Sequence, residues 1–270
     1  MRWSRIRAVV RRDLSVALGS KAVVLPALLV PVLLLVLLPA GIGLAPRYVD
    51  ADALGEVEQL LGLLPDEVLA TLPEDPALLG AVVTLTYLLS PLILLVPVML
   101  STVLAADGIA GEKERRTLEG LLLTPLSDRE LATAKLLAAW VPAVVIGVLG
   151  AVLYATVTNL TLGAQLGEWL LPTTEFTVLA LWTGPTFAAT ALGAVSLVSV
   201  RSRTTQEAFQ LGGFVVLPVV AMVVGQAAGV LLLSVWALLA AGLVALVAAA
   251  LLLVAATRSL SRPLLGPRLG

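Results

Sequence analysis

The sequence predicts an all-α integral membrane protein with six transmembrane helices, and three observations support this. Of 270 residues, 59% are hydrophobic and only 13% are charged, against roughly 25% in ordinary soluble domains. Charged residues are absent from several long runs, each able to hold the roughly 20 apolar residues that a transmembrane helix needs. Lys and Arg are concentrated in every second connection between these runs. A water-soluble globule is therefore excluded.

Five charge-free runs define the spans, because an Asp, Lys or Arg at the bilayer centre costs about 2.5 to 3.5 kcal/mol on insertion scales. The first four runs hold one helix each. The fifth run, 208–257, is long enough for two, and small and polar residues between Gly225 and Ser234 indicate the break. The predicted helices are 23–44, 79–106, 130–158, 176–200, 208–228 and 233–256. The chain, 1–270, thus forms a single transmembrane domain.

The distribution of cations predicts the topology. Sixteen of the seventeen Lys and Arg residues lie before the first helix or after the second, fourth and sixth. Only Arg47 lies elsewhere, in the loop 45–78, which is rich in Asp and Glu. Loops that carry the excess of Lys and Arg stay in the cytoplasm. We therefore expect both termini to be cytoplasmic and the loop 45–78 to be extracytoplasmic.

The segment 1–22 precedes the first span. Trp3, Ile6, Val10, Leu14 and Ala17 recur at intervals of three or four and are flanked by arginines. This pattern predicts an amphipathic helix that lies in the membrane interface with its arginines at the headgroups and that also helps to hold a cytoplasmic partner. A simple cationic topology anchor is the alternative. The apolar run that follows is too long for a signal peptide and is interpreted as a retained helix.

The segment after the second helix, 107–135, carries eleven charges of both signs in 29 residues. Helix-forming residues from Glu112 to Leu123 predict a short surface helix, which Pro125 ends because the residue before a proline avoids the α region. Ser127 and Glu130 fit a capping box that starts the third span. A solvated loop is the alternative, but these start and stop signals favour a shaped docking element over 107–129.

Two shorter features concern the fifth helix and the packing of the spans. Thr204 or Thr205 can cap the start of the fifth helix, with Glu207 in its first turn. Within the spans, small residues can allow helices to approach closely. These are Gly147, Gly150, Gly212 and Gly213.

Several chemistries are excluded by what the sequence lacks. It contains no Cys and no His, which removes thiolate or imidazole metal sites and Ser-His or Cys-His nucleophiles. It has no G-x-x-x-x-G-K-[ST] motif and therefore no P-loop of its own. The spans also lack the ionisable residues that ion-coupled transporters use. We expect the chain not to be an enzyme, so any nucleotide energy must come from a partner.

The stretch 111–130, followed by Lys135 and Leu136, closely resembles the cytoplasmic motif of ABC-2 type permeases, the membrane subunits of bacterial and archaeal ABC exporters. The resemblance implies that this stretch forms a coupling helix that docks in a groove of a separate ATPase. The residues that it implies for the ATPase contact are Glu112, Lys113, Glu114, Arg115, Thr117, Leu118 and Glu119.

The expected function is therefore that of a permease subunit that moves a substrate across or out of the prokaryotic plasma membrane. The expected partners are two ABC ATPase subunits, which bind ATP and Mg, a second copy of this or a related permease, and membrane lipid, but no nucleic acid. No cofactor or metal is expected on this chain. The alternative is a non-transporting scaffold that transmits ATP-driven motion to an extracytoplasmic partner. The sequence does not specify a substrate.

Overall fold

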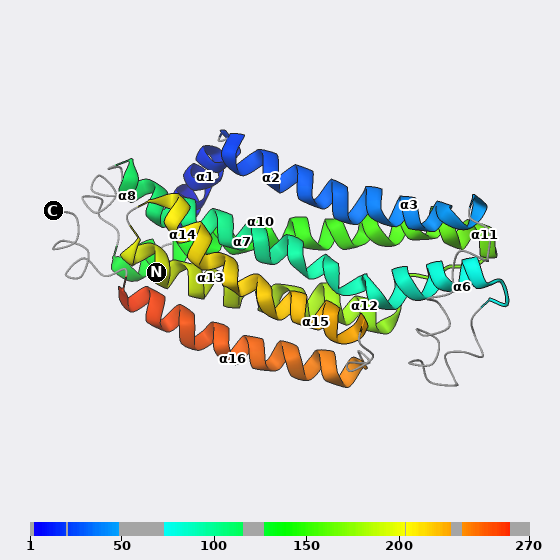
Figure 1. Cartoon of the computed structure of the whole chain (residues 1–270). Coiled ribbons are helices and arrows are strands. Elements are labelled where there is room, and N and C mark those ends of the chain that lie inside the picture. Colours follow the sequence, from blue (N-terminus) through cyan, green and yellow to red (C-terminus); the bar gives the residue numbers. More distant parts are fainter. Residues whose placement is uncertain are drawn as a thin grey trace.

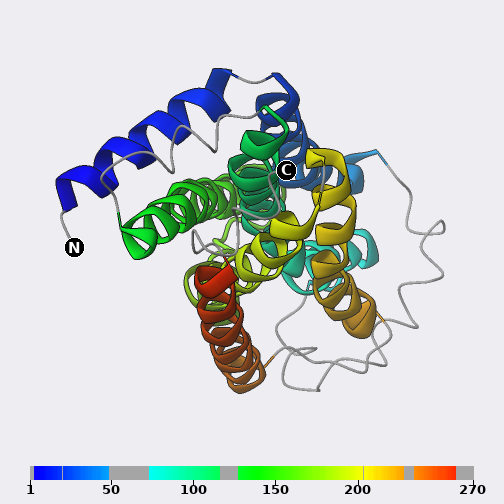
Figure 2. The same ribbon diagram turned by 90° about the vertical axis from the view of Figure 1, so that its left-hand side faces the viewer.

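The computed structural model describes residues 3–19, 21–48, 73–115, 127–202, 204–227 and 234–259. All regular structure in these ranges is helical. Most helices run side by side along one axis, while α1 (Trp3–Gly19) lies across one end of the bundle (Figures 1 and 2). The prediction of an all-α protein is confirmed for the described residues.

Five stretches of continuous helix are long and apolar enough to cross a membrane. They are Leu28–Arg47, Pro76–Glu114, Glu130–Leu166, Thr174–Arg201 and Val235–Arg258. These stretches match the first four predicted spans and the last one. The remaining prediction, 208–228, falls on helical residues that are not among the five. A total of six spans therefore stays a prediction.

The spans contain several changes of helix type. The first span is built from α2 (Lys21–Val32), η1 (Leu33–Leu37), α3 (Leu38–Leu44) and η2 (Ala45–Arg47). The second is built from α6 (Pro76–Val82), η4 (Val83–Leu88), η5 (Ser90–Leu94), α7 (Leu95–Ala106), η6 (Asp107–Gly111) and α8 (Glu112–Glu114). Of these, η1, η4 and η6 are π-helical turns, a feature frequent at functional sites.

The second span does not end at residue 106 as predicted. The backbone continues through the π turn η6 into α8 and stays helical to Glu114. No proline stands between residues 106 and 115, so nothing in the backbone forces the helix to stop there. Consequently Glu112 does not begin a separate surface helix. The rest of that predicted helix, and its stop at Pro125, lie outside the described residues.

The third span begins at the predicted capping box. The Ser127 hydroxyl accepts from the Glu130 backbone N–H, and the Glu130 carboxylate accepts from the Ser127 backbone N–H, both at 3.2 Å. This confirms the predicted start of α10 (Asp128–Thr158). The span continues through η7 (Asn159–Gly163) and α11 (Ala164–Leu166).

The fourth span comprises α12 (Thr174–Val178), η8 (Leu179–Thr183) and α13 (Gly184–Arg201). It is followed by α14 (Thr205–Gly212), η9 (Gly213–Val216), α15 (Leu217–Ala227) and α16 (Val235–Ser259). The Thr204 hydroxyl accepts from the Glu207 N–H at 3.1 Å, so Thr204 caps α14 as predicted. The Ser234 hydroxyl accepts from the Ala237 N–H at 3.3 Å, so a new helix, α16, starts at the end of the predicted break. Residues 228–233 of that break lie outside the described residues.

Glycines allow close helix packing at two of the predicted positions. A Cβ added to Gly147 would lie 2.8 Å from the Pro97 ring, and one added to Gly150 would lie 2.6 Å from Leu35. At Gly213, by contrast, a Cβ would meet nothing within 4 Å. Gly147 and Gly150 thus hold α10 against α7 and η1, whereas Gly213 serves no such purpose in the described chain.

Candidate functional site

The charged residues of the predicted docking element gather at one end of the bundle, which we call the charged end. It holds α1, α8, the starts of α10 and α14 and the end of α13 (Figure 1). At its centre lies the junction segment, which we define as residues 107–115. Side chains of this segment bond to three other helices and to Ser202, the residue after α13.

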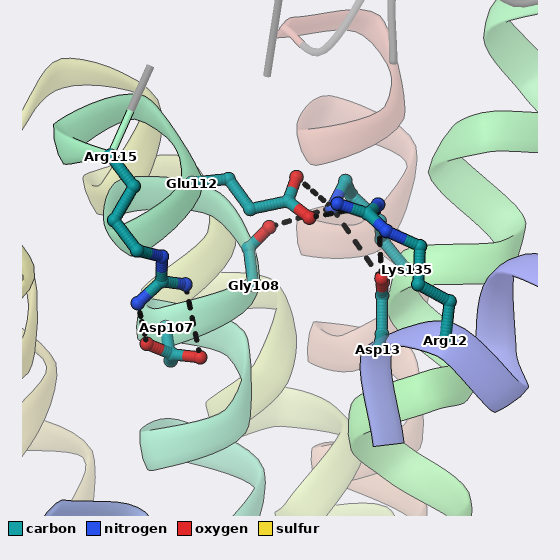
Figure 3. Close-up of polar contacts among 7 residues, drawn as sticks. All are labelled: Arg12, Asp13, Asp107, Gly108, Glu112, Arg115 and Lys135. Atoms are coloured by element: carbon teal, nitrogen blue, oxygen red, sulfur yellow. Dashed lines mark hydrogen bonds and ion pairs between the residues drawn. The ribbon is translucent and has the colours of Figure 1, made fainter. Parts of the chain in front are cut away.

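The core of the site is a buried ion pair between Glu112 on α8 and Lys135 on α10. Lys135 Nζ lies 2.6 Å from Glu112 Oε2 and also donates to the Gly108 carbonyl at 2.7 Å (Figure 3). The two side chains are 7% and 3% exposed, respectively. A buried charge is tolerated when it is paired and hydrogen-bonded. This pair therefore joins the end of the second span to the start of the third.

Helix α1 completes the same cluster. Arg12 Nη1 lies 3.3 Å from Glu112 Oε1, and Asp13 Oδ2 lies 3.6 Å from Lys135 Nζ (Figure 3). Burial raises the pKa of Asp13 above its ordinary value of 3.8, although Lys135 acts in the opposite direction. Beside these charges, Val9 packs in an apolar cluster with Leu131 of α10. Helix α1 is thus fixed to both spans by charge and by packing.

Two further contacts reach the fourth span and α14. Lys113 Nζ donates to the Ser202 carbonyl, next to the end of α13, at 3.4 Å. Glu114 Oε2 accepts from the backbone N–H of Thr205 at 3.0 Å and from its hydroxyl at 2.8 Å. A carboxylate is favourable at a helix N-terminus because it accepts from unpaired N–H groups and interacts with the helix dipole. Glu114 therefore caps α14 from another part of the chain.

Arg115 folds back on its own segment. Its guanidinium meets the Asp107 carboxylate in a paired contact, with Nη1 to Oδ1 at 3.0 Å and Nη2 to Oδ2 at 3.4 Å (Figure 3). This hydrogen bonding raises the pKa of Arg115 above its usual range. A Cβ on Gly111 would lie 2.7 Å from Asp107 Oδ1 and 3.2 Å from the Thr205 hydroxyl. Only glycine leaves space there for both neighbours.

The comparison with protein families gives this geometry a context. A family model described as "ABC-2 family transporter protein" matches residues 79–230, which is more than half of the chain. The chain belongs to the ABC-2 transporter family. It is therefore a multi-pass membrane permease of an ABC transporter, a class whose members are membrane transport components and work with an ABC ATPase. Searches of curated proteins and of solved structures find no match.

Four of the seven residues implied for the ATPase contact of this ABC-2 permease lie in the described junction segment. Each of the four makes a contact within the chain: Glu112, Lys113, Glu114 and Arg115. The other three lie outside the described residues: Thr117, Leu118 and Glu119. Their contact with an ATPase stays a prediction.

Sequence reasoning missed the partners of these residues in the permease. Asp13 is a lone acid in an arginine-rich helix, and Asp107 stands at the end of an apolar run; both positions could have suggested a paired cation. The sequence predicts Thr205 only as a possible cap for its own helix, whereas it donates to Glu114. No set of three or more metal-ligating residues occurs in the described ranges. The contacts of the junction segment thus connect the ends of several helices to one another.

Proposed function

We propose that this chain is the permease of an ATP-driven exporter in the cell membrane, and that its junction segment transmits the movement of a docked ATPase to the membrane helices. The observation that carries the proposal is the set of bonds from residues 107–115 to α1, α10 and α14 and to Ser202, the residue after α13. Two such permeases and two ATPases make up the working unit. A single short segment then controls the ends of several helices at once.

The junction segment is suited to transmission because it is rigidly held. It continues the helix of the second span, so no flexible connection separates it from the membrane. The pair of Glu112 and Lys135 is buried, and breaking such a pair is costly because it leaves an uncompensated buried charge. A displacement of the segment is therefore passed to α10 and α1 instead of being absorbed locally.

Docking and transmission fall on different residues in this proposal. Glu112 and Lys135 are buried and face each other, so they transmit. Arg115 is 46% exposed and Glu114 is exposed, so both remain accessible at the charged end. The resemblance adds Leu118 and Glu119 to the docking side.

The test uses the purified permease with its ATPase in vesicles, with three readouts: binding of the ATPase, ATP hydrolysis and movement of solute. The variant Leu118→Glu should lose ATPase binding while the permease keeps its thermal stability. The variant Glu112→Gln should keep the ATPase bound but uncouple hydrolysis from transport.

An opposite pattern would refute the division of roles. Full transport by Leu118→Glu would remove the case for docking at this segment. Normal coupling in Glu112→Gln would remove the case for transmission through the buried pair. A complex that hydrolyses ATP, binds an extracytoplasmic protein and moves no solute would instead favour the scaffold function.

A further inference from the structure

Helix α1 has a side that the bundle does not use. Val9 and Asp13 face α10, and Arg12 reaches Glu112. Arg7 and Arg11 are exposed, and neither makes an ion pair with any residue in the described ranges. Two arginines four residues apart thus stand on one face of the helix without a protein anion.

An apolar stripe runs beside these arginines. Trp3 is 65% exposed and Leu14 is only partly buried, while Val10, also partly buried, has one side against the apolar cluster of Val9 and Leu131. At 100° per residue, this stripe lies between the face that packs on α10 and the face that carries Arg7 and Arg11. A helix with adjacent protein-facing, apolar and cationic faces matches the surface of a bilayer at the edge of a membrane protein.

The position of α1 agrees with this reading. It lies across the charged end and extends beyond α10 at the side of the bundle (Figure 2). Ser20 alone separates it from α2, whose chain enters the first span directly. The helix therefore lies at the level where the spans leave the membrane, which is the level of the lipid headgroups.

We propose that the Arg7 and Arg11 face of α1 binds the phosphates of anionic phospholipids, while Trp3, Val10 and Leu14 rest in the acyl boundary. Guanidinium groups bind phosphate with paired hydrogen bonds. A soluble ATPase surface would leave the apolar stripe in water, whereas a lipid surface covers both faces together. This inference does not depend on the transport function, and it concerns the permease alone.

The experiment exploits the absence of cysteine in the native chain. A fluorophore is attached to Ser4→Cys, because Ser4 is exposed and precedes Arg7 and Arg11 by three and seven residues. The permease alone is placed in nanodiscs with phosphatidylglycerol or phosphatidylcholine, each carrying a nitroxide on its acyl chain near the headgroup. The fluorescence should be quenched at a several-fold lower mole fraction of labelled phosphatidylglycerol than of labelled phosphatidylcholine.

Variants assign this preference to the two arginines. Arg7→Gln and Arg11→Gln should each reduce it about fivefold, the change expected for one cation near an anionic surface. Arg7→Lys should retain most of it because the charge remains. Arg201→Gln is the matched control, since Arg201 is exposed at the same end on α13 and should leave the preference unchanged.

Three outcomes would overturn the proposal. The first is equal quenching by both lipids in the unsubstituted permease. The second is an unchanged preference in the double variant Arg7→Gln with Arg11→Gln. The third is an equal loss in Arg201→Gln, which would indicate a general charge effect. If the double variant keeps the lipid preference but loses ATPase binding, this face belongs to the ATPase and the lipid proposal fails.

Discussion

Replacing Lys135 by Met is the sharpest test of the buried cluster. Methionine is similar in length to the lysine stem but removes the charge and the donor. Glu112 then loses a bond of 2.6 Å and the Gly108 carbonyl loses one of 2.7 Å. Asp13 loses one of its two cations, at 3.6 Å, and keeps Arg12 at 3.6 Å. The carboxylates stay where they are, largely out of contact with water.

The size of the effect follows from these contacts. Removing one partner of a buried ion pair costs about 3 to 5 kcal/mol. Arg12 remains 3.3 Å from Glu112 and its side chain is 44% exposed, so part of the compensation survives. We therefore expect a loss near the lower end, about 3 kcal/mol in the free energy of unfolding. The double variant with Glu112→Gln should recover part of this loss because it removes the buried carboxylate that has lost its lysine.

The assay is a denaturant titration of the permease in mixed micelles, with the variant Lys113→Met as a matched control. Lys113 makes a single contact of 3.4 Å with the Ser202 carbonyl, so its replacement should cost about 1 kcal/mol or less. If Lys135→Met costs no more than Lys113→Met, the buried cluster does not hold the charged end together. If the Glu112→Gln double variant is no more stable than Lys135→Met alone, the penalty does not come from the buried Glu112 carboxylate losing its lysine.

Three further predictions follow from other parts of the chain. Burial raises the pKa of Asp13 above 3.8. At pH values just above 3.8, the Asp13 carboxyl therefore keeps its proton in the folded chain but has released it in the unfolded chain. The free energy of unfolding should fall as pH rises through this range. Denaturant titrations from about pH 4 to about pH 7 should show a weaker pH dependence in Asp13→Asn. Gly147→Ala places a Cβ 2.8 Å from the facing proline ring and should cost about 1 to 3 kcal/mol, whereas Gly41→Ala, with nothing within 4 Å, should be neutral or slightly stabilising in the same titration. In intact cells, Glu168→Cys should react with an impermeant thiol reagent and Arg201→Cys should react only after permeabilisation; the reverse pattern would invert the predicted topology.

The spans were largely predictable because the bilayer imposes a strong constraint on composition. A charge-free run of sufficient length can hardly be anything but a helix across the membrane. Local signals were also reliable where they involve neighbouring residues, as at the Ser127 and Glu130 capping box. The predicted helix end at residue 106 is wrong because charge limits a membrane span but does not end a helix. The backbone itself has no reason to break at Asp107.

The partners within the site could not be predicted for a different reason. Glu112 and Lys135 are 23 residues apart, and Glu112 and Arg12 are 100 apart. Such contacts depend on how the helices pack, which local periodicity does not specify. A dense group of mixed charges indicated a surface in contact with water or a partner. The structure shows instead that its first residues also satisfy one another and the neighbouring helices.

The buried cluster limits how this permease can be recombined with others. Its charges come from three separate parts of the chain, since Asp13, Glu112 and Lys135 stand on α1, α8 and α10. A chimera that exchanges only the stretch between the second and third spans would import a carboxylate without the lysine that neutralises it. Coupling the permease to a different ATPase therefore requires that all three positions be exchanged together.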